Sequence, residues 1–133
     1  MNESLDSGTQ NDLINYRLKR SIETLEEADY NARGGYFNAA VNRLYYACYY
    51  AASALMLYSN LEASTHKGIK TMLGLHFIKP GLLEAKYGRI YQQLYENRQS
   101  GDYEDFVYCD EELFAFLRPQ AEDFVKKISK HIS

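Results

Sequence analysis

Apolar residues recur at steps of three and four positions through most of the chain, which is the spacing of helices that bury one face. The first series predicts a helix that begins at Asn11 or Asp12, since either side chain can act as the N-cap. The glycine pair Gly34–Gly35 should end this helix, because glycine accepts the positive φ found at many helix C-termini. The apolar stripe consists of Ile14, Leu18, Ile22, Leu25, Ala28 and Ala32.

Residues 36–59 predict the central helix of the molecule, about 36 Å long at 1.5 Å per residue. Alanine and larger apolar residues leave this helix little polar surface, which indicates that other helices cover it on several sides. A loop over residues 60–65 should follow, with Ser64 or Thr65 as the N-cap of a third, shorter helix. Pro80–Gly81 marks the end of that helix.

A fourth helix is predicted over residues 82–100, closed by Gly101 and followed by an acidic and aromatic loop over residues 102–108. Asp110 should cap the last helix, in which Pro119 predicts a kink or a break. Because strict alternation of apolar and polar residues is absent, the pattern indicates an all-α fold of four long helices and one short helix. Residues 1–10 read as a disordered acidic tail and residues 11–133 as one domain.

Length and composition narrow the class of protein. A chain of 133 residues with 46% hydrophobic and 25% charged residues is typical of one folded, water-soluble domain. The longest uncharged apolar run, Leu44 to Tyr58, has 15 residues, whereas a membrane-spanning helix needs about 20. We therefore expect no membrane association and, because the N-terminus lacks the features of a secretory signal, a cytoplasmic location.

Charge and cysteine spacing exclude two kinds of site. The net charge of -3 comes from three acidic residues that precede the first basic residue, Arg17, so the chain lacks the basic excess of proteins that hold duplex nucleic acid. Cys48 and Cys109 are far apart and only three histidines are present, which gives no zinc-ligand spacing. We predict no metal and no cofactor, and both cysteines as packing residues.

Three segments place polar groups where a helix is otherwise apolar or where it begins or ends. They are Asn42-Arg43 with the tyrosines that follow, His66-Lys67-Gly68, and Arg98 to Tyr103. Together with Gly35-Tyr36-Phe37 and the Phe-x-Lys-x-Gly of residues 77–81, their order and spacing resemble small stand-alone HEPN-domain proteins. The resemblance extends from about residue 13 to residue 130.

The resemblance implies an up-and-down helical bundle that forms a homodimer. It also implies, as for many family members, a metal-independent ribonuclease, and a gene beside that of a small nucleotidyltransferase, the two forming a toxin–antitoxin pair. In active family members an arginine and a following histidine act in the cleft of the dimer. Here the arginine corresponds to Arg98, but Tyr103 stands where histidine is expected, within the pattern Arg98-x-x-x-Asp102-Tyr103. Tyrosine is almost wholly protonated at neutral pH and is a weak base.

Several residues allow both a structural and a functional interpretation. Arg98 and Asp102 can form an ion pair at the helix end, or can act with Tyr103 on RNA. Asn42 and Arg43 can hydrogen bond to the fourth helix, or can line the same cleft as Arg98. His66 with Lys67 can anchor a loop or contact a ligand, and the dipole of its helix should make His66 harder to protonate. Tyr46 and its neighbouring tyrosines can pack in the core or face a partner.

Two functional hypotheses follow. The first is a dimeric interaction or regulatory protein that works with a nucleotidyltransferase partner, favoured by the missing histidine and the acidic residues after Arg98. The second is a ribonuclease toxin that uses Arg98, Asp102 and Tyr103, favoured by the retained arginine and by Asn42. By resemblance, Tyr103 is also a candidate for modification by the partner enzyme.

Overall fold

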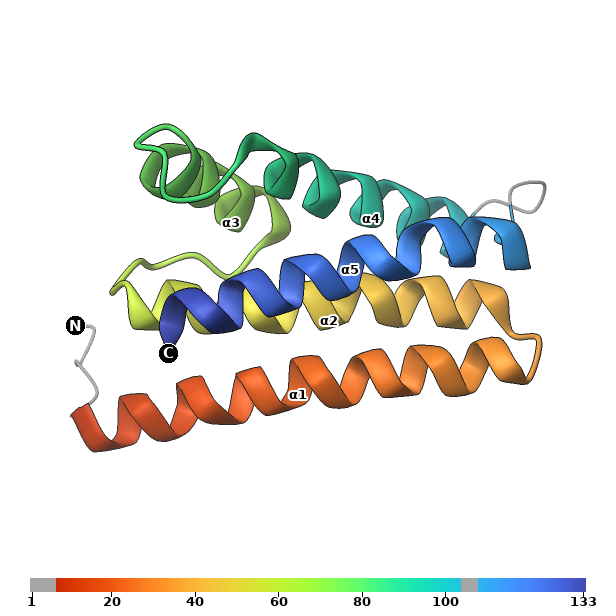
Figure 1. Ribbon diagram of the computed structural model, residues 1–133, viewed down its shortest axis with the longest axis horizontal. Coiled ribbons are helices and arrows are strands. Elements are labelled where there is room, and N and C mark those ends of the chain that lie inside the picture. The colour runs from red at the N-terminus through yellow and green to blue at the C-terminus, as the bar shows by residue number, and fades with distance from the viewer. Residues whose placement is uncertain (1–6, 104–107) are drawn as a thin grey trace.

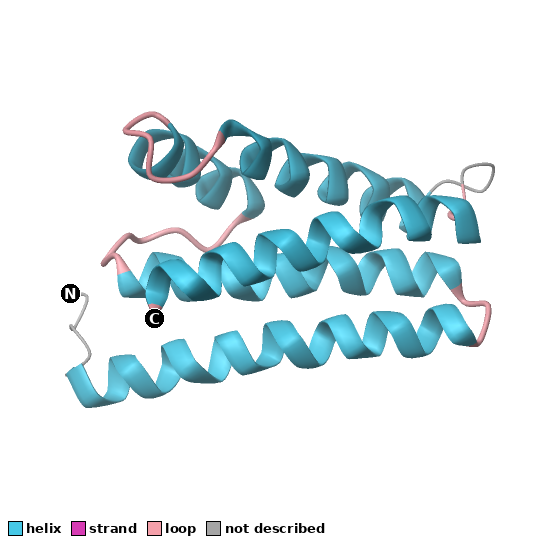
Figure 2. Cartoon of the chain, viewed as in Figure 1, coloured by secondary structure: helices cyan, strands magenta, loops and turns pink. Residues whose placement is uncertain are grey.

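The computed structural model describes the backbone of residues 7–103 and 108–133, and every regular element in these residues is a helix (Figures 1 and 2). The predicted all-α bundle of four long helices and one short helix is therefore confirmed. In chain order the elements are α1 (Ser7–Arg33), α2 (Phe37–Tyr58), α3 (His66–Leu73), the π-helical segment η1 (Gly74–Ile78), α4 (Ala85–Tyr103) and α5 (Glu111–Ile132).

Helices α1 and α2 form an antiparallel hairpin around the predicted glycine turn (Figure 1). Gly35 has a φ of +84°, a conformation that side chains rarely adopt, so glycine is required there. Residues that lie equally far from Gly35 along the chain face each other across the hairpin. Arg20 lies over the ring of Tyr50, and Arg17 Nη1 donates to Ser53 Oγ at 2.6 Å.

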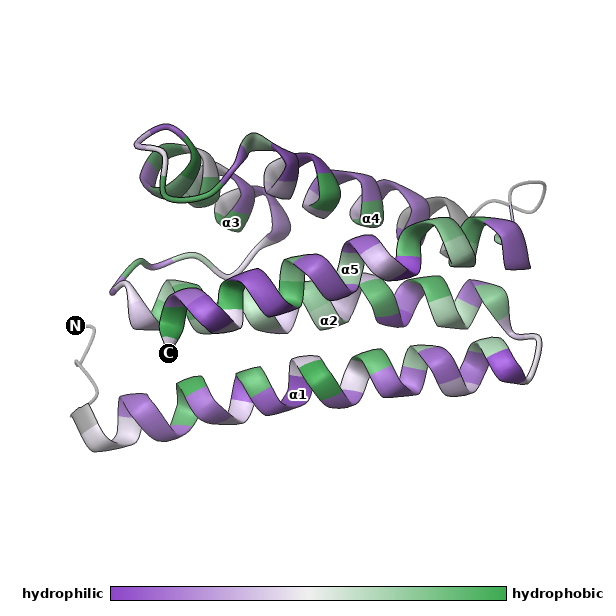
Figure 3. Ribbon diagram, in the orientation of Figure 1, coloured by the Kyte–Doolittle hydropathy of each residue, from purple (hydrophilic) through white to green (hydrophobic). Residues whose placement is uncertain are grey.

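Helix α2 is the centre of the bundle and contacts α1, α3, α4 and α5. Apolar segments recur along α1, α2 and α5 in Figure 3, alternating with polar ones. The small side chains of α2 let its neighbours approach closely, and the following α2 residues are fully or almost fully buried: Ala40, Val41, Leu44, Tyr45, Ala47, Cys48, Ala51, Ala52, Ala54, Leu55 and Met56. Burial on several sides explains why no polar face was visible in the sequence of this helix.

The last helix is fixed at its start and along its length. Asp110 accepts a hydrogen bond from the Leu113 amide at 2.9 Å, as its predicted capping role requires. Arg118 forms two bonds of 2.8 and 2.9 Å to the Asp29 carboxylate of α1. Pro119 lies inside α5 without breaking it, so of the predicted kink or break the break is wrong and the kink stays a prediction. Both Pro119 and Ala115, whose carbonyl loses its donor, are exposed, and water can take the place of that donor.

The observed helix ends differ most from the predicted ones at the start of α1 and at both ends of α4. Helix α1 begins at Ser7, not at Asn11 or Asp12, because Gln10 Nε2 ties its first turn to the Leu57 carbonyl at 2.6 Å. Helix α4 begins at Ala85 and continues through Gly101 to Tyr103, so part of the predicted 102–108 loop is helical. Residues 1–6 of the predicted tail and residues 104–107 lie outside the described residues.

The buried face of α1 follows the predicted stripe at Ile14, Leu25 and Ala28 but departs from it in the middle of the helix. Ile22 is 51% exposed, whereas Ser21 and Thr24 are fully buried. Burial costs these hydroxyls little, because each donates to a carbonyl of its own helix, Ser21 to Leu18 and Thr24 to Arg20. Within the described part of the chain, no helix is long and apolar enough to cross a membrane.

Candidate functional site

Side chains from three helices converge around Arg98 near the C-terminal end of α4. We call this group the arginine–tyrosine cluster: Tyr45 and Tyr46 from α2, His66 from α3, and Tyr95 and Arg98 from α4. Residues 95 and 98 lie three apart and therefore on the same side of α4. The packing of α2 and α3 against α4 brings the other three side chains to that side.

The Arg98 guanidinium lies against three aromatic rings. Its Cζ atom is 5.0 Å from the centroid of Tyr95, 5.4 Å from that of Tyr45 and 5.9 Å from that of Tyr46. These distances are those of cation–π contacts, which lower the entropy cost of holding a flexible arginine in place. The cluster therefore fixes a positive charge in one position.

Tyr45 is the buried centre of the cluster, with 3% of its surface exposed. Burial raises the pKa of Tyr45 to about 12, although the nearby Arg98 charge acts in the opposite direction. At neutral pH the phenol is therefore protonated, and its hydroxyl lies 3.0 Å from His66 Nδ1. Tyr45 thus links the arginine to the histidine.

His66 is packed against the rings of α4 and hydrogen-bonded at both ring nitrogens. Its ring stacks on Tyr95, with centroids 3.7 Å apart and planes 9° apart, and on Tyr91 at 4.7 Å. Its Nε2 lies 3.0 Å from Gln92 Oε1, and Gln92 Nε2 donates to Glu96 Oε2 at 3.0 Å. Since Gln92 Oε1 can only accept, we infer that His66 Nε2 carries the proton and that Nδ1 accepts from Tyr45.

The pKa of His66 is lowered, as the sequence predicted, but mainly for a different reason. Desolvation is the largest cause, and the positive charges of Lys70 and Arg98 act in the same direction, while Gln92 and Glu96 oppose them. The predicted anchoring role fits the contacts of His66 with α2 and α4. The N-cap of α3 is Thr65, which accepts from the Gly68 amide at 3.0 Å.

This lowered pKa makes the stability of the protein depend on pH. His66 is charged more readily in the unfolded chain, where its pKa is about 6.5, than in the folded state. The stabilisation is therefore present above about pH 6.5 and is lost as the pH falls toward the folded pKa. We expect urea unfolding below pH 6.5 to show a smaller loss of stability for His66→Gln than for wild type. An equal loss in both proteins would contradict this assignment.

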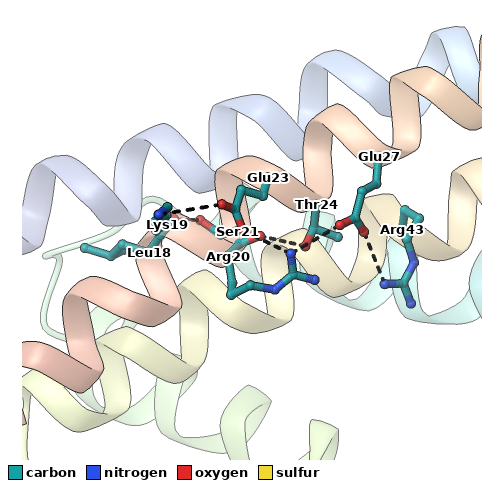
Figure 4. A network of polar contacts seen from close by, with 8 residues as sticks. All are labelled: Leu18, Lys19, Arg20, Ser21, Glu23, Thr24, Glu27 and Arg43. Atoms are coloured by element: carbon teal, nitrogen blue, oxygen red, sulfur yellow. Dashed lines mark hydrogen bonds and ion pairs between the residues drawn. The ribbon is translucent and has the colours of Figure 1, made fainter.

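Arg43 takes its ion pair from a different helix than predicted. Arg43 Nη1 lies 3.7 Å from Glu27 of α1, which also binds Arg20 at 3.2 Å (Figure 4). Arg43 Nη2 donates to Asn42 Oδ1 at 3.0 Å. Arg43 therefore forms its ion pair with α1 and not with α4, so the predicted network with α4 is wrong for this contact. Arg43 nevertheless borders the cluster, because its Cζ lies 5.0 Å from the ring of Tyr46.

The remaining predicted site residues are less informative. Lys67 is exposed in the first turn of α3. Asp102 and Tyr103 belong to the last turn of α4, but their side chains lie outside the described residues, so their pairing with Arg98 and their roles stay predictions. Among the described residues, no group of three or more His, Cys, Asp or Glu side chains could hold a metal ion.

Tyr95 and Gln92 were missed as site residues, although the tyrosine stripe of α4 was visible in the sequence. Two of its three members are core residues, since Tyr87 and Tyr91 are 4% and 0% exposed. Tyr95 is half-buried and forms the platform that both His66 and Arg98 contact. The spacing of four residues between the tyrosines was the sequence feature that could have indicated this platform.

Known proteins are similar to this chain over nearly its whole length. The sequence model of the HEPN domain matches residues 14–132. A Thermotoga maritima protein named UPF0332 is 34% identical, over 90% of this chain and 91% of its own length. A Methanocaldococcus jannaschii protein named "Putative toxin" is 36% identical over 89% of this chain and 93% of its own length, and a second one of that name is 27% identical.

Proposed function

This chain belongs to the HEPN domain family, and we propose that it acts as the dimeric interaction component of a toxin–antitoxin-like pair whose partner is a small nucleotidyltransferase. Its contact surface is the arginine–tyrosine cluster, with Arg98 as the residue that binds an anionic group of the partner. The names of two relatives support the toxin–antitoxin context.

The arrangement of His66 is the observation that carries this proposal. Among the described residues around Arg98, His66 is the histidine that could act as a base. Both of its ring nitrogens already have hydrogen-bond partners. A general base needs a nitrogen that can reach the proton to be removed, here the 2′-hydroxyl of a ribose. The geometry therefore favours a site in which Arg98 binds an anionic group over a site that cleaves RNA.

Composition at the surface supports a protein partner. Arginine and tyrosine, with tryptophan, are the residues most enriched at the energetic centres of protein interfaces, and the cluster places Arg98 beside the partly exposed Tyr46 and Tyr95. Because the guanidinium is already held by the rings, binding costs less side-chain entropy than it would for a free arginine.

The second candidate function is a metal-independent ribonuclease. The position of Arg98 against the three tyrosine rings also favours this function, because a guanidinium can stabilise the negative charge that develops on a phosphate during cleavage. In this alternative the base must come from Asp102 or Tyr103 of either protomer.

Replacement of Arg98 tests the proposal. The nucleotidyltransferase that the proposal expects to be encoded beside the gene would be purified, and its affinity for wild type, Arg98→Ala and Arg89→Ala would be measured by calorimetry. Arg89 is an exposed arginine of the same helix and serves as the matched control. Loss of a charge-assisted hydrogen bond costs about 1.5–3 kcal/mol, so we expect binding about 10- to 100-fold weaker for Arg98→Ala and nearly unchanged for Arg89→Ala.

The same samples separate the two candidate functions. Light scattering should show that all three proteins are dimers, and incubation with RNA in chelator should show no cleavage that depends on Arg98. Cleavage by wild type that is lost in Arg98→Ala would establish the ribonuclease instead. A well-folded dimer that neither binds the nucleotidyltransferase nor cleaves RNA would overturn both functions.

A further inference from the structure

In the proposed contact Arg98 binds the anionic group, and His66 shares the surroundings of that arginine. His66 and Arg98 both lie against the rings of Tyr95 and Tyr45, at 3.7 and 5.7 Å for the imidazole and 5.0 and 5.4 Å for the guanidinium. Because Arg98 is charged and lies against the same two rings, its charge acts on the protonation of His66.

We propose that His66 and Arg98 form one proton-linked site for a phosphate-like oxyanion, in which binding of the oxyanion at Arg98 causes His66 to take up a proton. This inference rests on the proposed function only because both use the same surface. It adds that binding at this surface is regulated by pH. His66 is thereby a positioning residue, which acts on the anion through Tyr45, Tyr95 and its own charge.

The hydrogen bonds around His66 allow the proton to be gained without loss of the cluster. In the neutral ring, Nε2 donates to Gln92 and Nδ1 accepts from the Tyr45 hydroxyl. A proton from solvent adds to Nδ1, which then donates to the Tyr45 oxygen, because a hydroxyl can turn from donor to acceptor. The protonated ring keeps its stack on Tyr95 and gains the attraction of a cation for an aromatic face.

Burial and the charges around His66 together favour its neutral form. From α4 it faces Arg98 and, through Gln92, the carboxylate of Glu96, together with the phenols of Tyr91 and Tyr95; α3 contributes Lys70 and α2 contributes Tyr45. Lys70 and Arg98 oppose protonation and Glu96 favours it, while burial lowers the pKa of the ring further. An oxyanion bound to Arg98 cancels one of the opposing charges.

Linkage makes this effect reciprocal. If the oxyanion raises the pKa of His66, then protonated His66 must bind the oxyanion more tightly by the same factor. A rise of one pKa unit corresponds to about tenfold tighter binding at low pH. Affinity should therefore increase as the pH falls through the titration of His66, while the stability of the unliganded protein decreases over the same range.

A titration of the whole 133-residue chain tests the linkage directly. Sulfate is the probe, since it keeps its charge between about pH 5 and pH 8, where histidine titrates. The pKa of the His66 ring would be measured by NMR in sulfate and in chloride of equal ionic strength, for wild type, Arg98→Ala and the control Arg89→Ala. We expect sulfate to raise the pKa in wild type and Arg89→Ala, and Arg98→Ala to start with a higher pKa that sulfate leaves unchanged.

Binding of a tetrauridylate provides the second measurement, because its phosphodiesters and bases do not titrate in this range. Wild type should bind it up to about tenfold more tightly at the acidic end, and His66→Gln, which keeps hydrogen-bonding groups but does not titrate, should lose that dependence. If tetrauridylate fails to bind but sulfate shifts His66, the oxyanion comes from a source other than RNA and the linkage stands.

Two outcomes would overturn the inference. One is a His66 pKa that is the same in sulfate and chloride, and the other is a His66 pKa that Arg98→Ala does not change. Neither measurement uses the nucleotidyltransferase, so a failure of the proposed function leaves the linkage testable. Conversely, if the nucleotidyltransferase binds through Arg98 and the pKa of His66 does not change, the proposed function stands and the linkage is refuted.

Discussion

Replacement of Phe124 by alanine is expected to lower the free energy of unfolding by about 3–5 kcal/mol, the range for removal of a large ring from a core. Phe124 is fully buried, and its ring stacks on Tyr91 with centroids 5.6 Å apart and planes 15° apart. The ring of Tyr87 is also near, at 6.3 Å. Rigid helices cannot collapse fully into the space of a missing ring, so the cavity and the lost burial both destabilise the fold.

Helix α5 offers a matched control for this substitution. Phe116 lies on the same helix and is 60% exposed, so Phe116→Ala changes the same residue type with little loss of burial. Urea unfolding of both variants and wild type measures the difference. A cost for Phe124→Ala close to that for Phe116→Ala would mean that the core is not packed as described.

The Phe124 substitution also reaches the candidate site through stacked rings. Tyr91 lies between Phe124 and His66, 5.6 Å from the first and 4.7 Å from the second. A cavity beside Tyr91 should loosen this stack and therefore the position of His66. We conclude that the core of the bundle and the arginine–tyrosine cluster share one aromatic column.

Local sequence features predicted the helices and two of their caps. Thr65 and Asp110 cap α3 and α5 as expected, because capping depends on a side chain and an amide three residues away. The glycine turn between α1 and α2 is equally local. Gly101 failed as a predicted end of α4, since glycine only lowers helix stability, by about 1 kcal/mol, and does not prevent a helix from continuing.

The contacts between helices could not be predicted in the same way. Ser21 and Thr24 look polar in the sequence, yet they are buried because their hydroxyls bond within α1. The motif at Arg98 was identified by resemblance, but the arrival of His66 beside it depends on how α3 packs against α4. Neither spacing nor composition contains that information, because the two residues lie on different helices.

Introduction of a carboxyl at Ala47 is expected to destabilise the protein by about 3–5 kcal/mol, the cost of an unpaired charge in a buried position. Ala47 is fully buried on α2. It lies four residues after Arg43 and three before Tyr50, which both contact α1, so it shares their face of the helix. By the register of the hairpin it lies close to the level of Thr24, which is also fully buried.

The pH dependence of Ala47→Glu distinguishes a buried charge from simple overpacking. Burial raises the pKa of the introduced carboxyl above its unfolded value of about 4.3, so the folded state binds the proton more readily. The destabilisation should be complete at neutral pH and should shrink as the pH falls toward 4.3, where the carboxyl becomes neutral. Overpacking alone would cost the same at every pH.

The control is Ala39→Glu, at an exposed position in the first turn of the same helix. A carboxylate there is favoured slightly by the helix dipole, so its stability should equal or slightly exceed that of wild type. If both variants unfold at the same denaturant concentration, α1 does not cover Ala47. The α1–α2 hairpin would then be unable to hold α2, and with it Tyr45 and Tyr46, in the position that the arginine–tyrosine cluster requires.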